Sequence, residues 1–233
     1  MLSDMELIEL QAITLFRYDA NGRMLCLNED DPEEPAPRLF LGRTKAGTIW
    51  RFRSDLPDAL IRVLERLLRA EPIATDLAQP PQILTGLIAT LNVQAPVQTT
   101  WMGPAWRFPD ELVPPEGVVA ITSSNVGTLQ RHYPWSFSHL EDLQPCMAMI
   151  VDGEAAALCF SSRTSPEAAG AGVFTVEAFR GRGYATAVVT AWARAVRESK
   201  RIPLYSTSWD NLASRSIAKK LGLVLYSADL WIN

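Results

Sequence analysis

The chain has 233 residues, of which 48% are hydrophobic and 21% are charged, and its formal net charge is −4. This length suits one large domain or two small ones, and the composition is typical of soluble globular proteins. A net negative chain is not expected to bind nucleic acid, because phosphate binding favours a basic excess. No apolar run approaches the ~18 residues of a membrane helix, so we expect no membrane partner and a cytoplasmic location.

The cysteines and histidines do not suggest a metal site. Cys26, Cys146 and Cys159 lie far apart in apolar segments, and the only histidines are His132 and His139. No Cys-x-x-Cys pair is present. The sequence therefore predicts buried thiols in a reducing compartment and no metal ligands.

The N-terminal part begins with two predicted hairpins. Apolar runs flank Asn21-Gly22 and again Ala46-Gly47, which is the pattern of two strands joined by a tight turn. The acidic stretch 28–37 between them is expected to be a solvated loop.

Two helices are predicted next. Apolar side chains recur at helical spacing through residues 56–72, where Pro72 ends the helix and Asp55 is expected to cap its start. A shorter helix is predicted within residues 81–92. These elements indicate an α+β domain of unknown role, which either completes an acceptor site or mediates formation of a homodimer.

Residues 108–117 hold three prolines and three acidic residues, and they mark the predicted border between domains 1–115 and 116–233. Beyond the border, short strand and helix patterns alternate. From Cys146 the predicted order is strand, strand, strand, helix, strand, helix, strand, with a hairpin turn at Asp152-Gly153. This order is typical of a mixed α/β sheet.

The segment 173–196 runs from a predicted strand through two glycines into a predicted helix. Gly181 and Gly183 allow backbone torsions that other residues disfavour, and the start of a helix leaves N–H donors unpaired. These donors, the helix dipole and the guanidinium groups of Arg180 and Arg182 together favour a bound anion. The sequence therefore predicts a phosphate or pyrophosphate site at this turn.

The spacing Arg180-x-x-Gly183-x-Ala185 resembles the element of the GNAT N-acetyltransferase superfamily that binds the pyrophosphate of acetyl-CoA. The resemblance covers residues 145–232 and implies a GNAT-like acyltransferase fold for the C-terminal half. It implies acetyl-CoA as co-substrate, with the strand end pairing with the pantetheine arm through its backbone. The residues implied at this part of the site are Phe174, Thr175, Val176, Arg180, Gly181, Arg182, Gly183, Tyr184, Ala185 and Thr186.

A second stretch, "WDNLASRSIAKKLGLVLY", is similar to another element of the same superfamily through Asn211, Ser214, Leu221 and Gly222. Asp210 is expected to cap this helix, and Gly222 is expected to end it. By resemblance, Asn211 approaches the pantetheine or the thiol end of the co-substrate, and Ser214 lines the same cleft.

The family reaction is direct transfer of an acetyl group to an amine, here an amine of a small molecule or peptide. The amine must be neutral to attack, so a base or a water chain removes a proton. We take Glu141 as the candidate base. Alternatives are Glu177, His132 and His139.

The usual general acid of the family is missing. Many members carry a tyrosine seven residues after the asparagine of the second element, and that position is Ala218 here. We take Tyr226 as the candidate acid. Alternatives are Tyr205, Ser208 and a water molecule.

Two other functions stay open at this point. Ala218 favours a non-catalytic CoA-binding sensor or interaction module on the same fold, and the chain length of the acyl group cannot be read from the turn. Residues 131–142 and residues 101–108 are rich in aromatic side chains, and either stretch could line the acceptor site.

Overall fold

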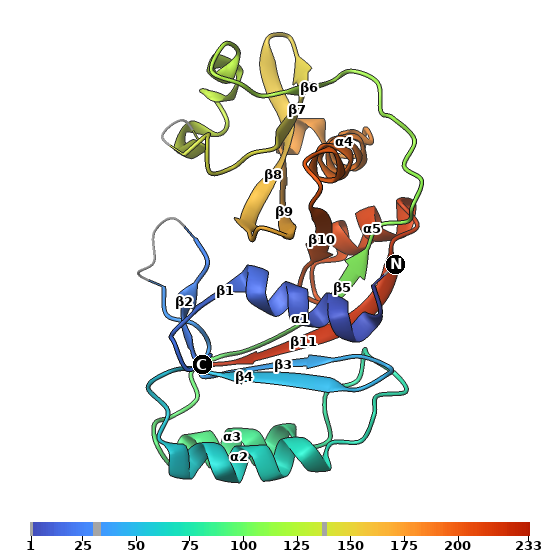
Figure 1. Ribbon diagram of the computed structural model, residues 1–233. Helices are drawn as coiled ribbons and strands as arrows, with labels where there is room; N and C mark the ends of the chain where they lie inside the picture. The colour runs from blue at the N-terminus through green and yellow to red at the C-terminus, as the bar shows by residue number, and fades with distance from the viewer. Residues whose placement is uncertain (1, 30–33, 137–138) are drawn as a thin grey trace. The chain divides into compact units, whose positions relative to one another are not determined.

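The computed structural model describes residues 2–29, 34–136 and 139–233 (Figure 1). The chain forms two compact units. The first contains Met1–Trp106, Ser206–Leu212 and Leu225–Asn233, and the second contains Arg107–Tyr205 and Ala213–Val224. The second unit therefore begins at Arg107, and two later segments return to the first unit. The division into independent domains 1–115 and 116–233 stays a prediction. Part of the acidic stretch 28–37, residues 30–33, lies outside the described residues.

The first unit opens with a helix and a hairpin. Ser3 caps α1 (Asp4–Leu15) in a capping box, since its side chain accepts from the Glu6 N–H while the Glu6 carboxylate accepts from the Ser3 N–H. Strands β1 (Phe16–Tyr18) and β2 (Met24–Leu27) pair antiparallel. Gly22 has a φ of 76° in the turn between them, so the predicted hairpin is confirmed.

Four strands of the first unit follow the order β4 (Thr48–Phe52), β3 (Leu39–Arg43), β11 (Val224–Ile232), β5 (Thr100–Arg107). The predicted β3–β4 hairpin is confirmed by their antiparallel pairing. The last strand of the chain also pairs with β3, from Ala228 opposite Arg43 to Ile232 opposite Leu39. The C-terminal strand is therefore part of the core of the first unit.

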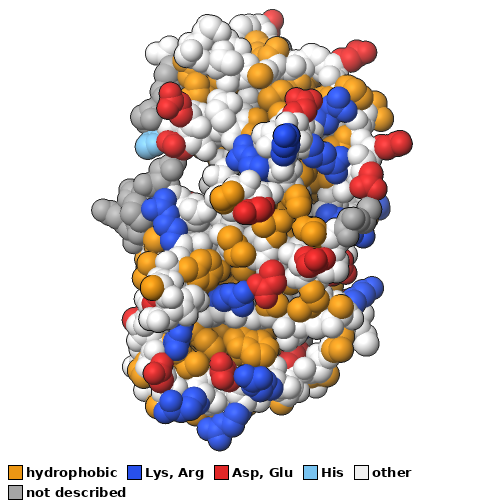
Figure 2. Space-filling view, in the orientation of Figure 1, with side chains coloured by type: hydrophobic (Ala, Val, Ile, Leu, Met, Phe, Trp, Pro, Cys, Tyr) orange, Lys and Arg blue, Asp and Glu red, His pale blue; other side chains and the backbone are white. Residues whose placement is uncertain are grey.

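Helices α2 (Asp58–Ala70) and α3 (Leu84–Asn92) cover the core of this sheet. Ile61, Leu64 and Leu68 of α2 are buried. The opposite side of α2 is exposed and rich in arginine, and Figure 2 shows blue side chains over this region at the bottom of the view. The expectation that Asp55 caps α2 is wrong, because the N-cap is Pro57 and the Asp55 carboxylate instead binds Arg53 Nε at 2.8 Å.

The second unit has five strands in the order β10 (Ile202–Ser206), β9 (Ala168–Thr175), β8 (Glu154–Thr164), β7 (Cys146–Val151), β6 (Val118–Ala120). The segments between and after these strands contain helices α4 (Tyr184–Glu198) and α5 (Leu212–Lys220). They also contain short 3₁₀ turns, which are η1 (Val126–Leu129), η2 (Pro134–Ser136) and η3 (Glu177–Phe179). Asp152 and Gly153 have φ values of 51° and 83°, so the predicted β7–β8 turn is confirmed. The predicted order of elements from Cys146 is also confirmed.

In the second unit, the two faces of the sheet have different covers. Helix α4 packs against β7, β8 and β9, and Trp192 Nε1 donates to Ser161 Oγ at 3.2 Å. Phe160, the neighbour of Ser161 on β8, points to the other face, where it packs with Leu129, Tyr133 and Leu143. The segment between β6 and β7 therefore covers the face opposite α4.

Within residues 2–29, 34–136 and 139–233, every helix is too short or too polar to cross a bilayer. No group of three or more His, Cys, Asp or Glu side chains in those ranges is arranged to hold a metal ion.

Candidate functional site

Strand β9 separates from β10 partway along its length. With β8, β9 pairs from Ala169 to Thr175. With β10 the parallel register covers only Ala168 to Gly170, and the last pair joins Gly170 to Leu204. Among the described strands, residues 171–175 therefore have a β-partner on one side only. An unpaired strand edge presents N–H and C=O groups that an extended amide-containing ligand can use.

The turn after β9 leaves a series of N–H groups without partners. Gly181 and Gly183 have φ values of 80° and 82°, and Gly183 is the N-cap of α4 without any side-chain cap. The first N–H of α4 to bond is that of Ala187, which donates to Gly183 O at 3.1 Å. Within the described parts of the chain, no acceptor is found for the N–H groups of residues 181–186. This backbone fits an anion at the start of a helix of 15 residues.

The side chains around this turn add positive charge. Arg180 and Arg182 are exposed. The Arg182 guanidinium lies 5.2 Å from the centre of the Phe179 ring, and its Nη2 donates to Ala178 O at 3.4 Å. A Cβ on Gly181 or Gly183 would meet no atom within 4 Å. Glycine is therefore required here by the backbone torsion, and the space in front of the turn is open.

The second motif is divided between the two units. Asn211 is exposed and belongs to the segment Ser206–Leu212 of the first unit. Ser214 lies on α5 in the second unit, where its carbonyl accepts from Tyr205 Oη at 3.4 Å. The expectation that Asp210 caps α5 is wrong by one position, because the helix starts at Leu212 directly after Asn211. The expected end is confirmed, since Gly222 has a φ of 63°.

The position of the missing family tyrosine and the candidate acid Tyr226 are both buried. Ala218, at the position of the family tyrosine, is 2% exposed. Tyr226 is 0% exposed in the first unit, and its hydroxyl donates to Gln11 Oε1. Burial raises the pKa of Tyr226 well above its ordinary value. A phenol enclosed in this way has no surface through which it could reach a substrate, which argues against Tyr226 as the acid.

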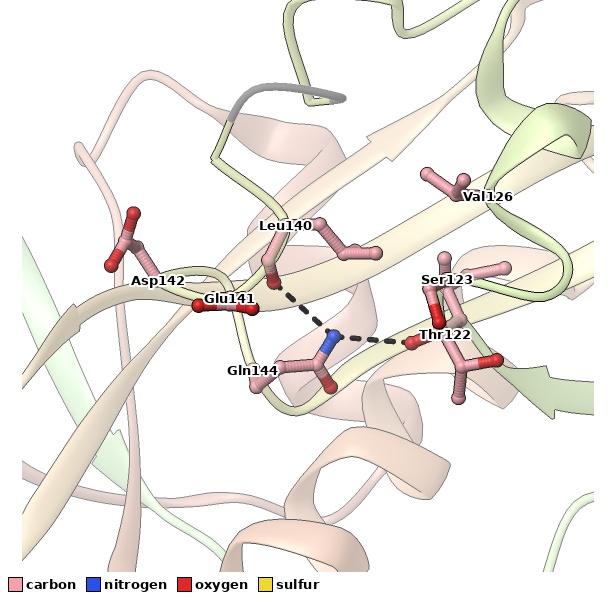
Figure 3. Close-up of a pocket in the computed structure, with 8 residues that line it drawn as sticks. Thr122, Ser123, Val126, Leu140, Glu141, Asp142 and Gln144 are labelled. Carbon is pink, nitrogen blue, oxygen red and sulfur yellow. Dashed lines mark hydrogen bonds between the residues drawn. The ribbon is translucent and has the colours of Figure 1, made fainter.

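Glu141 lies in a pocket of the second unit (Figure 3), with a volume of about 530 Å³. Gln144 closes one side, since its Nε2 donates to Ile121 O and Leu140 O at 3.1 and 3.2 Å. The lining residues are Ile121, Thr122, Ser123, Val126, Leu140, Glu141, Asp142 and Gln144.

The strand register places this pocket away from the glycine turn. Leu143 O accepts from Ser161 N, and Ser161 is paired with Ala171 of β9. The turn leaves the sheet after Thr175, four residues beyond Ala171, which is roughly 13 Å along a strand. Glu141 therefore lies nearer to the start of the unpaired edge of β9 than to its end.

Aromatic side chains that are distant in sequence meet beside β9. Trp135 lies 5.8 Å from Phe174 and 5.2 Å from Phe160, measured between ring centres, and Tyr133 lies 6.4 Å from Phe174. The sequence marked residues 131–142 as acceptor lining and Phe174 only for its backbone. The sequence places Phe174 in a strand, so its side chain was expected to project from a face of the sheet. Which aromatic side chains it meets there depends on the fold.

A charged pair lies next to these rings. The Glu154 carboxylate accepts from Arg131 Nη1 at 2.8 Å and lies 3.3 Å from His132 Nε2. The hydrogen bond from Arg131 holds the pKa of the Glu154 carboxyl below its ordinary value. His132 is therefore positioned by a carboxylate that is already paired.

Residues 150–232 match the family described as FR47-like protein, which is related to the GNAT enzymes. The match contains residues 171–175 of β9, the glycine turn, α4, α5 and all of β11. No curated protein matches the chain.

Solved structures of the GNAT class are similar to this chain. One is a putative acetyltransferase from Novosphingobium aromaticivorans DSM 12444, with 17% identity over 58% of this chain and 65% of that one and a TM-score of 0.48. Another, from Colwellia psychrerythraea, has 15% identity over 62% of each chain and a TM-score of 0.45. A GCN5-related N-acetyltransferase-like protein from Streptococcus suis 89/1591 has 18% identity over 87% and 86% and a TM-score of 0.49. The chain spans less than two thirds of the first two proteins.

Proposed function

We propose that this protein is an N-acetyltransferase that moves an acetyl group from acetyl-CoA to an amine of a small molecule or peptide. The observation that supports this best is the continuity of two features of one segment. The unpaired edge of β9, residues 171–175, leads directly into the turn whose N–H groups 181–186 have no partner in the described structure. An amide-containing arm that ends in a pyrophosphate matches both features in sequence.

The proposed contacts assign separate tasks to the strand and to the turn. The backbone of Phe174 and Thr175 holds the pantetheine arm, and Arg180 and Arg182 pair with phosphate oxygens. Val176, which the resemblance also implied, is not kept, because its N–H already donates to Ala156 O and its C=O already accepts from Phe179 N. The backbone N–H groups from Gly181 to Thr186 and the positive end of the α4 dipole complete the anion site. Bound acetyl-CoA supplies the thioester. Ser214 of α5 and Asn211, which lies directly before α5, are proposed to contact its arm.

The proton transfers are the less constrained part of this proposal. Glu141 is kept as the proposed base, because its exposed carboxylate lines a pocket of the second unit, which it shares with the exposed carboxylate of Asp142. A water molecule is the proposed link, since the attacking amine and the carboxylate need a connected path. The three free thiols of Cys26, Cys146 and Cys159 support action in a reducing compartment such as the cytoplasm.

A second candidate function is supported by one observation. The position of the family tyrosine is a buried alanine, Ala218, and Tyr226 is enclosed in the first unit. A protein that binds CoA at the same turn without transferring an acyl group would also have this arrangement. An amine panel with acetyl-CoA separates the two functions, because only the enzyme releases free thiol.

The first experiment is a calorimetric titration with acetyl-CoA of the wild type, Gly183→Ala and Gly153→Ala. The two glycines are matched, with φ values of 82° and 83° and open space around both, so alanine strains both turns equally. We expect Gly183→Ala to weaken binding at least about tenfold, since the turn must re-orient its N–H groups. Gly153→Ala should bind like the wild type. Equal affinities of the two variants for acetyl-CoA would refute the proposal that its pyrophosphate binds at the Gly183 turn.

A further inference from the structure

Four aromatic side chains of the second unit form a surface that the proposed acetyl-CoA site does not use. We call Tyr133, Trp135, Phe160 and Phe174 the aromatic patch. Trp135 is 43% exposed and Phe174 is 50% exposed, whereas Phe160 and Tyr133 are buried beneath them. Contiguous exposed rings are uncommon on a protein surface and often mark a binding site.

The patch has a defined geometry. The rings of Phe160 and Phe174 are stacked at 9° with centres 6.0 Å apart, and Trp135 meets both of them edge-on. Gly172 makes this stack possible, because a Cβ there would lie 2.5 Å from Phe160 Cζ. The two exposed rings are therefore held by packing from below.

A buried hydroxyl belongs to the same patch. Tyr133 is 5% exposed, and its Oη is enclosed beside the Val176 backbone. Burial raises the pKa of Tyr133 to about 12, more than the backbone hydrogen bond with Val176 lowers it. Tyr133 therefore supports the exposed rings from below.

The patch lies next to the proposed thioester path but on another side of the strand. Phe174 sits between Val173 and Thr175 in the unpaired part of β9, whose edge is proposed to hold the pantetheine arm. The ring of Phe174 stands on the face of the sheet, because side chains project perpendicular to the hydrogen-bonding edge. A group bound on the ring would therefore approach the donor from the face that α4 does not cover.

We propose that the aromatic patch binds the acceptor, and that the acceptor is an amine carried on an aromatic or similarly flat apolar group. This inference rests on the proposed function. A flat ring would stack against Trp135 and Phe174, the two exposed rings of the patch. The patch lies on the face of the sheet, whereas the acetyl-CoA arm is proposed to run along the edge of β9. The patch is therefore better placed for the acceptor than for the acyl chain.

The test uses two amines of equal charge, 2-phenylethylamine and n-butylamine. Their dissociation constants are measured with and without CoA for the full-length wild type, Trp135→Ala and Val113→Ala. Val113 is 84% exposed in the same unit and outside the patch, so it controls for the loss of a surface apolar side chain. We expect the wild type and Val113→Ala to bind 2-phenylethylamine about tenfold more tightly than n-butylamine, and Trp135→Ala to reduce this ratio below about twofold.

Equal affinities of the wild type for both amines, or a ratio that Trp135→Ala leaves unchanged, would overturn the inference. The inference would also be overturned if hexanoyl-CoA bound more tightly than acetyl-CoA and if Trp135→Ala, but not Val113→Ala, removed this difference in affinity. The patch would then bind the acyl chain. Failure of the proposed function gives a different result. Acetyl-CoA would then not bind, while the amine ratio measured without CoA would still report on the patch.

Discussion

Asp229 shows how one buried residue can make stability depend on pH. It lies on β11 and is 1% exposed, with Gln11 Nε2 donating to one carboxyl oxygen and Ser227 Oγ to the other, the latter at 3.1 Å. Burial is the largest effect on this group and raises its pKa to about 7, although the Ser227 hydrogen bond lowers it. The folded protein therefore retains a proton that the unfolded chain releases near pH 3.8.

We predict that Asp229 lowers stability as pH rises from about 4 to 7. In this range the folded state binds one more proton than the unfolded state, so the free energy of unfolding falls, by up to about 4 kcal/mol for this group. Asp229→Asn removes the titration. Urea unfolding of both proteins at a series of pH values checks this, and a constant difference between them from pH 4 to pH 7 would contradict it.

Tyr133→Phe separates a functional hydroxyl from a structural one. The Oη atom is enclosed beside the Val176 backbone, so its removal should change the free energy of unfolding by no more than about 1 kcal/mol. Because an enclosed hydroxyl cannot reach a ligand, the same change should leave the affinities for the amine acceptor and for acetyl-CoA unchanged. Thermal unfolding and steady-state thiol release measure the two effects. A stability loss above 1 kcal/mol would show that the hydroxyl is part of the core.

At the scale of elements, β9 combines a structural and a functional task. Its pairing with β8 continues to Thr175, while its pairing with β10 stops at Gly170. Gly172 lies in the part of β9 that pairs with β8 but no longer with β10. It is directly opposite Phe160, and the Phe160 ring occupies the space that a side chain at position 172 would fill. A residue with a Cβ at this point would push the ring away from the strand.

We predict that Gly172→Ala destabilises the protein by about 1–3 kcal/mol, because a Cβ 2.5 Å from the Phe160 ring forces that ring to move. The displacement should also disturb the stack with Phe174. Combining Gly172→Ala with Phe160→Leu should recover part of the stability, since leucine is smaller and flexible. Chemical denaturation of the three variants measures this, and strictly additive losses in the double variant would count against the contact.

At the scale of the whole molecule, the two units are interleaved in sequence. The first unit takes its third strand in sheet order, β11, from the end of the chain, after the second unit has been completed. Leu230 and Ile232 of β11 are fully buried in the same cluster as Leu39 and Leu41 of β3. Neither half of the sequence therefore contains all the strands of the first sheet.

We predict that a fragment of residues 1–115 does not fold by itself, because it lacks the strand between β3 and β5. A fragment of residues 116–233 should expose β11 as an apolar unpaired strand and aggregate. Mixing the two fragments should restore the circular dichroism of the intact chain. A cooperative unfolding transition of either fragment alone would show that the border at residue 115 separates independent domains.

The sequence by itself determined the features that depend on short stretches of backbone. The turns at Asn21-Gly22 and Asp152-Gly153, the end of α5 at Gly222 and the glycine turn before α4 all follow from local torsions. Helical spacing of apolar residues likewise predicted α2, α3 and α4. Caps were less predictable, as Asp55 and Asp210 show, because several polar residues near a helix start can compete for one position.

Only the tertiary structure decided which distant segments meet. The partner of β11, the point where β9 leaves β10 and the gathering of Trp135, Phe160 and Phe174 all depend on long-range strand register. Register is fixed by the burial of whole faces, which no short stretch contains. The anion turn could therefore be predicted from sequence, whereas the aromatic patch and the burial of Tyr226 required the folded chain.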